Sequence, residues 1–353
     1  PTRARMGLAF EGQTFTERFL IVDVEMAQSP FADQRVPERW FWFDPPFHSG
    51  KSALLHRQPD DIYRIDLQLD PGADPEAEAD EARVLARIRA IVGEAPFRID
   101  WTSVYSFRCM RLDRFVHGRV IFAGDSAHVV SPFGARGGNG GIHDIDNLGW
   151  KLAAVVQGAA DAALLESYDS ERGHGADENI ANSARATDFM TPKTEMEALF
   201  RHETLRLARR HPFARKLINS GRLSTPCSLG GFPMQTPGAA PVPPGTPVVD
   251  APLGAGRWLA GEVQGAFTLM GVGDVALPDV AGIRRIGIGR RAAAYPCHDD
   301  AEGLVAQRYG TGGAYLFRPD GHVAAVFDAP DAAAVAAARD RALGHHAMRQ
   351  AAE

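Results

Sequence analysis

Residues 118–158 restrict the fold of this chain more than any other stretch, because they read as a strand, a glycine-rich loop and a helix in immediate succession. Residues 120–123 (VIFA) form a short apolar run that is typical of a buried parallel strand. Gly124 and Asp125 follow where that strand ends. The five glycines in residues 134–141 indicate backbone with positive φ, or backbone that approaches another group closely.

The helix that follows is expected to be amphipathic. Asn139 or Asp144 is predicted to cap its amino end, and Gly158 is predicted to end it. The stripe expected to be buried consists of Ile145, Leu148, Leu152, Val155 and Val156.

A carboxylate at the end of a strand, beside the amino end of a helix, is a common geometry for ligand binding. Open α/β sheets bind cofactors at this place. The helix favours an anionic or electron-rich group, and the Asp125 carboxylate could accept hydrogen bonds from the hydroxyls of a sugar or polyol. Spacing alone leaves a second interpretation open, in which this is a capped loop of any α/β protein.

The run GDSAHVVSPFGARGGNGGIHDIDNLGWKLA, which begins at Gly124, resembles the second FAD-binding motif of the FAD-dependent aromatic hydroxylases. These are the single-component, class A flavoprotein monooxygenases, similar to para-hydroxybenzoate and phenol hydroxylase. The later run ESYDSER, with Tyr168, Glu171 and Arg172, resembles the Tyr-x-x-Glu-Arg of that family.

The resemblance implies a set of residues that bind FAD. Asp125, in the Gly124–Asp125 pair, would contact the ribityl chain, and Pro132 would lie beside the isoalloxazine ring. The glycine-rich turn and the helix start would face the pyrimidine edge of the flavin. The residues assigned to that turn are Gly137, Gly138, Asn139, Gly140 and Gly141. The resemblance assigns no side chain to catalysis, and His128 is interpreted as structural.

Composition argues against several other classes of function. The hydrophobic content of 45% and charged content of 23% are ordinary for a globular chain. A net charge of −6 does not favour nucleic acid, and no apolar run approaches membrane-spanning length. Three scattered cysteines, Cys109, Cys227 and Cys297, form neither a disulfide framework nor a metal-ligand spacing, so we expect a reducing cytoplasm and no metal.

The first 113 residues are predicted to form an antiparallel sheet, because several strand patterns follow one another with no helix between them. A helix is expected over residues 75–92, with Asp74 as its cap and Gly93 at its end. The predicted strands cover residues 19–26, 39–43, 52–56, 62–69 and much of 97–114. In the resembling family a sheet at this place covers the substrate pocket.

A fingerprint G-x-G-x-x-G, which holds the pyrophosphate of a dinucleotide in this family, occurs nowhere in the sequence. The chain therefore resembles the carboxyl-terminal two-thirds of such an enzyme. The predicted class is mixed α/β: the later part of a Rossmann-like FAD-binding fold, with an inserted antiparallel substrate sheet and a thioredoxin-like C-terminal domain. The expected divisions are residues 1–113 (substrate sheet), 114–190 (FAD-binding part), 191–240 (helices and linker) and 241–353 (thioredoxin-like domain).

The thioredoxin-like domain is expected from strands at 267–269, 284–288, 314–317 and 322–327 and a helix at 331–343, beyond a Pro/Gly-rich linker at 230–252. Since Cys297 stands alone without a C-x-x-C, we expect no thiol redox activity there, and a role in stability or in homodimer formation instead.

The resemblance implies hydroxylation of a phenol-like aromatic substrate, with FAD as cofactor, NADH or NADPH as reductant and O₂ as co-substrate. Two alternatives remain at this stage. The polypeptide could be a truncated, non-catalytic fragment of such an enzyme, or it could keep the flavin and carry out epoxidation or another oxidation.

Overall fold

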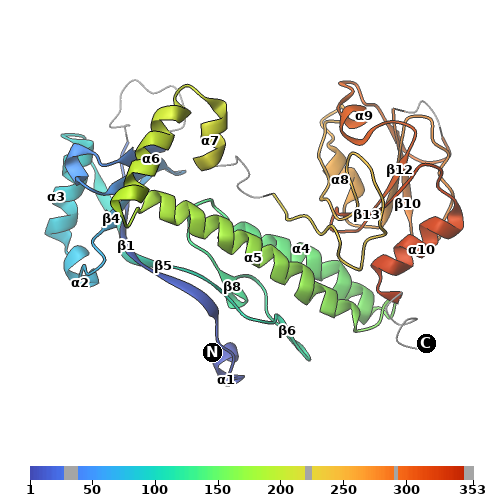
Figure 1. The fold of residues 1–353 in the computed structure, drawn as a ribbon, viewed down its shortest axis with the longest axis horizontal. Helices are drawn as coiled ribbons and strands as arrows, with labels where there is room; N and C mark the ends of the chain where they lie inside the picture. The colour runs from blue at the N-terminus through green and yellow to red at the C-terminus, as the bar shows by residue number, and fades with distance from the viewer. Residues whose placement is uncertain (28–38, 219–224, 290–292, 346–353) are drawn as a thin grey trace. The chain divides into compact units, whose positions relative to one another are not determined.

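The computed structural model describes residues 1–27, 39–218, 225–289 and 293–345 (Figure 1). It has two compact units, and each is built from separate stretches of the chain. Unit 1 comprises Pro1–Arg111, His128–Gly137 and Asn179–Leu223. Unit 2 comprises Leu112–Ala127, Gly138–Glu178 and Ser224–Glu353. Each unit is described by itself.

Unit 1 is built on an antiparallel sheet whose described strands run in the order β2-β3-β4-β1-β5-β8. The long strands β1 and β5 pair along most of their length, and the hairpin β3–β4 turns at Asp60 and Asp61, which both have positive φ. The strands are β1 (Glu11–Glu25), β2 (Arg39–Phe43), β3 (Ser52–Arg57), β4 (Ile62–Leu69), β5 (Arg98–Arg111) and β8 (His128–Val129). The predicted antiparallel sheet is confirmed.

One face of this sheet is sealed by helix α3 (Glu81–Val92). Val84, Ile88 and Val92 of α3 pack against buried side chains of β1, β3 and β4. The prediction of one helix over residues 75–92 is wrong, because the chain forms α2 (Pro75–Glu78) and then α3. The break has a local cause: the Asp80 side chain accepts a hydrogen bond from the Arg83 N–H (3.1 Å) and starts a second helix.

The other face of the sheet carries aromatic side chains and is partly covered by Ile180 and Ala184 of helix α5 (Leu164–Met190). Helix α5 runs from unit 2 into unit 1 at residues 178–179 (Figure 1). The remaining helices of unit 1 are α1 (Thr2–Arg5), the 3-10 turn η1 (Pro46–His48), α6 (Glu195–Ala208) and α7 (Pro212–Ile218).

Unit 2 contains a second sheet with the strand order β11-β10-β9-β12-β13 among its described residues. Strand β10 is parallel to β9 and β11, whereas β12 is antiparallel to β9 and β13. The elements are α8 (Leu259–Val263), β9 (Thr268–Val272), β10 (Arg284–Ile288), β11 (Cys297–His298), α9 (Leu304–Tyr309), β12 (Ala314–Phe317), β13 (Val323–Phe327) and α10 (Ala332–Ala342). Strands β9, β10, β12 and β13 and helix α10 lie where the sequence predicted them, whereas β11, α8 and α9 had not been predicted.

Unit 2 also holds the strands β6 (Val116–His117) and β7 (Val120–Ile121), the turn η2 (Gly124–Ser126) and all of helix α4 (Gly137–Val156) except its first residue. The prediction of a buried parallel strand at residues 120–123 is wrong. Strand β7 pairs antiparallel with β6, and 36% of Val120 is exposed. Among the described residues, β6 and β7 form a sheet of two strands.

The predicted buried stripe of α4 is also wrong for most of its members. Leu148 is buried, but Ile145, Leu152 and Val156 are exposed, and Val155 is half-buried. The side of the helix that faces the unit interior carries Asp144, Asn147 and Lys151 instead. The physical reason is that buried charges of α5 and of the β12–β13 turn compensate these side chains, as described below.

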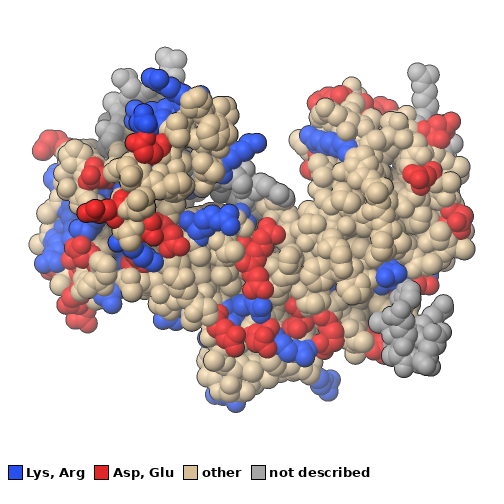
Figure 2. Space-filling model, viewed as in Figure 1, with Lys and Arg blue, Asp and Glu red and all other residues tan. Residues whose placement is uncertain are grey.

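Two further observations concern the surface charge and the length of the helices. Acidic and basic side chains are interspersed on the face drawn in Figure 2. No helix in the described residues combines the length and the apolar character needed to cross a membrane.

Candidate functional site

The turn that follows β7 holds the first two residues predicted to bind a cofactor. Gly124 has φ of 56°, a conformation that a side chain would disfavour. Its N–H donates to Asp144 Oδ2 (2.9 Å), and its carbonyl accepts from the Ala127 N–H (2.8 Å). The next residue, Asp125, is exposed. The backbone of the turn is therefore held from inside while the Asp125 carboxylate faces solvent.

The glycine-rich start of α4 lies against the same turn. A Cβ atom built on Gly141 would lie 3.4 Å from the Cα of Gly124, so the two backbones approach closely. Helix α4 begins at Gly137, ahead of Asn139, and the first N–H groups of a helix have no intrahelical acceptor. Gly124, Asp125, Gly138, Asn139, Gly140 and Gly141 all belong to unit 2. The prediction that Asp144 or Asn139 caps the helix is wrong, since both lie within it.

A buried ion pair supports the turn. Asp144 Oδ1 accepts from Arg172 Nε at 2.8 Å, and both side chains are almost fully buried. Burial would lower the pKa of Arg172, but the Asp144 carboxylate outweighs it and keeps the guanidinium charged. The Tyr168 hydroxyl donates to the carbonyl of Phe122 at 2.8 Å, two residues before the turn. The Tyr168 and Arg172 of the family pattern thus hold the backbone that carries Gly124 and Asp125.

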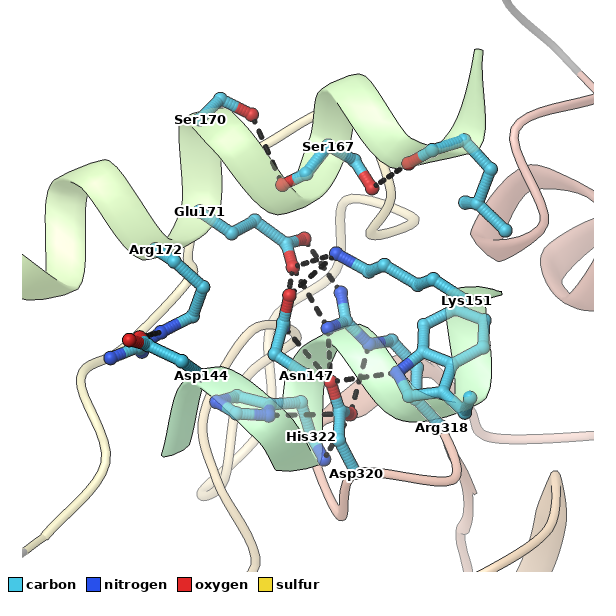
Figure 3. Close-up of polar contacts among 12 residues, drawn as sticks. Asp144, Asn147, Lys151, Ser167, Ser170, Glu171, Arg172, Arg318, Asp320 and His322 are labelled. Carbon is cyan, nitrogen blue, oxygen red and sulfur yellow. Dashed lines mark hydrogen bonds and ion pairs between the residues drawn. The ribbon is translucent and has the colours of Figure 1, made fainter. Parts of the chain in front are cut away.

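Next to this pair lies a fully buried cluster of opposite charges, which we call the buried charge network: Lys151, Glu171, Arg318 and Asp320 (Figure 3). Arg318 of the β12–β13 turn donates to both oxygens of Glu171, at 2.7 and 2.9 Å. Lys151 of α4 donates to Glu171 Oε2 at 2.7 Å. Arg318 also donates to Asp320 Oδ1 at 3.0 Å.

Neutral groups complete the buried charge network. The Asn147 amide of α4 donates to Glu171 (2.8 Å) and to Asp320 (3.1 Å), and the Trp150 indole N–H donates to Asp320 (3.1 Å). Two cations and two carboxylates balance one another, which is the condition for keeping charges inside a protein. The arrangement ties helices α4 and α5 to the turn between β12 and β13 within unit 2.

The pKa values in the network follow from burial and charge together. Burial would raise the pKa of Glu171, but the Arg318 guanidinium and the Lys151 ammonium outweigh it and hold this pKa well below its ordinary value. Burial lowers the pKa of Lys151 to about 8, although the Glu171 carboxylate opposes the shift. For Asp320, the attraction of Arg318 and His322 exceeds the effect of burial and lowers its pKa. Both carboxyls are therefore ionised at neutral pH.

Sequence reasoning assigned Asp144 to a helix cap, so it missed the ion pair of Asp144 with Arg172, and it also missed the buried charge network. A signal was present, because Asp144, Asn147 and Lys151 follow one another at intervals of three and four residues, which places them on one helix face. Apolar residues are more numerous on α4, so the prediction placed the buried side of the helix on the apolar face instead. Arg318, Asp320 and their neighbours come from a turn more than 140 residues away along the chain, for which α4 gives no signal.

The two other predicted residues, Pro132 and Gly137, belong to unit 1. Pro132 is exposed, and its neighbour Phe133 packs edge-on against Phe19 and Phe107 of the sheet, at ring distances of 5.5 and 5.4 Å. The Ser131 hydroxyl, which is buried, hydrogen-bonds Thr187 Oγ1 of α5 at 2.7 Å. The loop that carries Pro132 is thus anchored to the aromatic face of the sheet and to α5.

The residues in unit 2 fit a flavin. Glycine at 124 and 141 leaves the backbone of the turn and of the helix start uncovered by side chains, and an exposed carboxylate stands beside them. A hollow of about 800 Å³ extends along the exposed face of α4, lined among others by Gly138, Gly141, Ile142 and Ile145. Among the described residues, no group of three or more His, Cys, Asp or Glu side chains is arranged to hold a metal ion.

Comparison with known proteins gives the family. Residues 1–183 match the model of the FAD binding domain. The 3-(3-hydroxy-phenyl)propionate/3-hydroxycinnamic acid hydroxylase of Mycolicibacterium gilvum is 32% identical over 219 residues, which are 62% of this chain and 37% of the relative. The enzyme of the same name from Paraburkholderia xenovorans is 32% identical over 206 residues, 58% of this chain and 32% of the relative. The matched region thus spans about a third of the length of these relatives.

Solved structures share the fold. The flavin-dependent monooxygenase PieE, in complex with FAD and substrate, superposes with a TM-score of 0.75 at 21% identity, over 97% of this chain and 68% of that chain. Aklavinone-11 hydroxylase, with FAD and aklavinone, gives a TM-score of 0.74 at 21% identity, over 97% of this chain and 65% of that chain. Since the family model covers more than half of the 353 residues, the chain belongs to the FAD binding domain family, that of the FAD-dependent aromatic hydroxylases of class A.

Proposed function

We propose that this protein is a FAD-dependent monooxygenase that hydroxylates a phenol-like aromatic substrate with NADH or NADPH and O₂. The observation that carries the proposal is the Gly124–Asp125 turn, held by the buried Asp144–Arg172 pair against the start of α4. The family membership supports it, because the turn and the helix start lie within the residues that match the FAD binding domain.

Within this proposal each residue has a definite task. Asp125 accepts hydrogen bonds from the ribityl hydroxyls, and Pro132 borders the isoalloxazine ring. The N–H groups at the start of α4, over residues 137–141, stabilise negative charge at the pyrimidine edge. When bound, the flavin supplies the redox chemistry, taking electrons from the nicotinamide and activating O₂. The chain contributes position, electric field and the exclusion of water.

The substrate class is inferred from the relatives and from the sheet of unit 1. The two curated relatives named above are hydroxylases of 3-(3-hydroxy-phenyl)propionate and 3-hydroxycinnamic acid, so each acts on a ring that carries a hydroxyl. The aromatic face of the sheet, with Phe19, Phe107 and Phe133 in mutual contact, is suited to pack against such a ring. We therefore infer a phenol rather than an unsubstituted aromatic.

The origin of the inserted oxygen tests the proposal. A panel of phenols is incubated with the full-length protein, FAD and NADH or NADPH under ¹⁸O₂, and the product is analysed by mass spectrometry. We expect one labelled oxygen atom per product molecule and no label when ¹⁸O is supplied as water. Oxidation of NAD(P)H that yields only hydrogen peroxide, or product without label, would reject hydroxylation.

We further infer that residues 241–353 form a thioredoxin-like domain without redox activity. The parallel pair β9–β10, the antiparallel strands β12 and β13 and the terminal helix α10 support this inference. Cys297 is a free, half-buried thiol on β11. A homodimer and a cytoplasmic location remain parts of the proposal, the latter because the cysteine usage suits a reducing compartment.

A further inference from the structure

Asp66 is a carboxylate placed in the middle of the aromatic face of the unit 1 sheet. On β4 it lies directly opposite Ile21 of β1 and Leu54 of β3. Directly paired residues of neighbouring strands point to the same face. Leu54 and Ile21 both pack in the cluster of Phe15, Phe19 and Phe107, so Asp66 shares that face rather than the face sealed by α3.

One oxygen of Asp66 has no partner in the described part of the chain. Its Oδ1 atom is buried and accepts no hydrogen bond from any described residue. The nearest charged groups on the same face are Arg64 and, directly opposite it on β1, Asp23. Arg64 donates two hydrogen bonds to Asp23, of 2.8 and 2.7 Å. A buried carboxylate oxygen without a donor is costly, and such groups in native proteins call for an explanation.

The side chains around Asp66 are largely aromatic. Phe41 extends the row beyond Leu54, and it packs against Phe43 at 4.9 Å between ring centroids. Further along the face, Phe19, Phe107 and Phe133 touch one another, and Tyr105 adjoins Phe107 at 5.6 Å. Phe19 and Phe107 are 1% and 2% exposed, whereas Tyr105 keeps 53% of its surface exposed, so the face is open at Tyr105. Phe133 also directly follows Pro132 of the flavin motif.

We propose that Asp66 binds the substrate: its carboxylate accepts a hydrogen bond from the ring hydroxyl of a phenol that packs against the aromatic side chains of this face. The inference rests on the proposed function and adds the residue that selects a hydroxyl-bearing ring. A phenol supplies the donor that the orphaned oxygen lacks, and its ring packs against the aromatic side chains of this face. A site built around a buried acceptor rejects an analogue without the donor.

The ionisation of Asp66 gives the site a pH dependence. Burial raises the pKa of Asp66 to about 6, whereas Arg64 opposes the shift and Asp23 adds to it. From β3, His56 faces the same row as Arg64, and burial lowers its pKa to about 4, so it stays neutral at pH 6. The α5 side chains packed on this face, Ile180 and Ala184, carry no charge. Preference for a hydroxyl should therefore weaken as the pH falls through about 6.

The experiment compares two fluorinated probes that differ in one hydrogen-bond donor. 4-Fluorophenol and 4-fluoroanisole are titrated into the full-length protein with FAD present, and ¹⁹F NMR reports binding without any turnover. The wild type should prefer the phenol by about tenfold or more at pH 8, the effect of a hydrogen bond to a charged acceptor. In Asp66→Val that preference should fall to about twofold or less, and Asp66→Asn should lie between.

Stability separates this role from a structural one. The substitution Asp66→Val removes a carboxylate with a buried, unpaired oxygen and suits a strand between Ile21 and Leu54. It should therefore raise the melting temperature while it lowers the discrimination. The matched control is Glu25→Gln, which removes a carboxylate of β1 that accepts a hydrogen bond from Arg98. This variant should keep the wild-type preference for 4-fluorophenol. Equal preference in the Val variant and the wild type, or no preference in the wild type, would overturn the proposal. Labelled product under ¹⁸O₂ in the same preparation would then show that hydroxylation itself stands.

Discussion

At the scale of single residues, Asp144 was predicted to cap helix α4 but instead holds the turn that precedes the helix. One of its oxygens binds Arg172 of α5 and the other holds the N–H of Gly124, at 2.8 and 2.9 Å. Because the Arg172 guanidinium is almost fully buried, Asp144 is also the charge that allows it to stay there. The position of the Gly124–Asp125 turn therefore depends on a buried pair of residues outside the turn itself.

We expect Asp144→Ala to destabilise the protein by about 3–5 kcal/mol, since it leaves the buried guanidinium of Arg172 uncompensated and the Gly124 N–H without this acceptor. Urea denaturation measures the loss. The control is Asp146→Ala, two residues along the same helix at an exposed position, for which we expect a change within about 0.5 kcal/mol. Similar values for the two variants would mean that the pair does not carry this energy.

At the scale of elements, helix α4 turns its polar side inward and much of its apolar side outward. The inward side is stabilised because Lys151 and Asn147 meet Glu171 of α5 and the β12–β13 turn in one buried charge network. The C-terminal sheet is thus connected to the helix whose amino end faces the proposed flavin position. The network also makes stability depend on pH.

The pH dependence follows from the lowered pKa values of Glu171 and Asp320. Below about pH 4.3 the unfolded chain binds protons at these carboxyls that the folded chain does not, so stability is present above that pH and is lost as the pH falls further. We expect Glu171→Gln to be less stable at pH 7 by about 3–5 kcal/mol, because it leaves Lys151 and Arg318 undercompensated. Its remaining stability should fall less steeply with acid than that of the wild type.

Urea titrations between pH 7 and pH 3 measure both effects in one series. Glu166→Gln is the control, an exposed carboxylate on the same helix that pairs with Arg114, and it should reproduce the wild-type profile closely. An acid profile of Glu171→Gln as steep as that of the wild type would show that the pKa of Glu171 is not lowered on folding.

At the scale of the whole molecule, the 353 residues contain one of the two parts that hold FAD in this family. In the proposed function the Gly124–Asp125 turn and the start of α4 bind the ribityl and ring end, whereas the G-x-G-x-x-G fingerprint for the pyrophosphate does not occur in the sequence. We therefore expect a polypeptide of residues 1–353, made alone, to bind FAD poorly and to show no monooxygenase turnover. Gel filtration with FAD followed by a visible spectrum decides this, and a yellow protein with one flavin per chain would contradict it.

Local sequence determined much of the architecture. Alternation of apolar residues predicted β1 and β4, Asp74 and Gly93 marked ends of helical segments, and the strands β9, β10, β12 and β13 were predicted within a few residues. These features depend on periodicity, on caps and on the backbone freedom of glycine, all of which act over a few residues. The glycine-rich motif and the family it resembles could be read in the same way.

Tertiary structure alone decided which face of α4 is buried and how the turn at Gly124 is held. Both depend on Arg172, Arg318 and Asp320, which reach α4 only after the chain has folded. Hydrophobicity alone predicts that Ile145 is buried and Lys151 exposed. The buried partner Glu171 reverses this order, because it compensates the charge of Lys151. Burial of a charge is a property of the pair, and a pair formed across long sequence separations leaves no periodic signal in either segment.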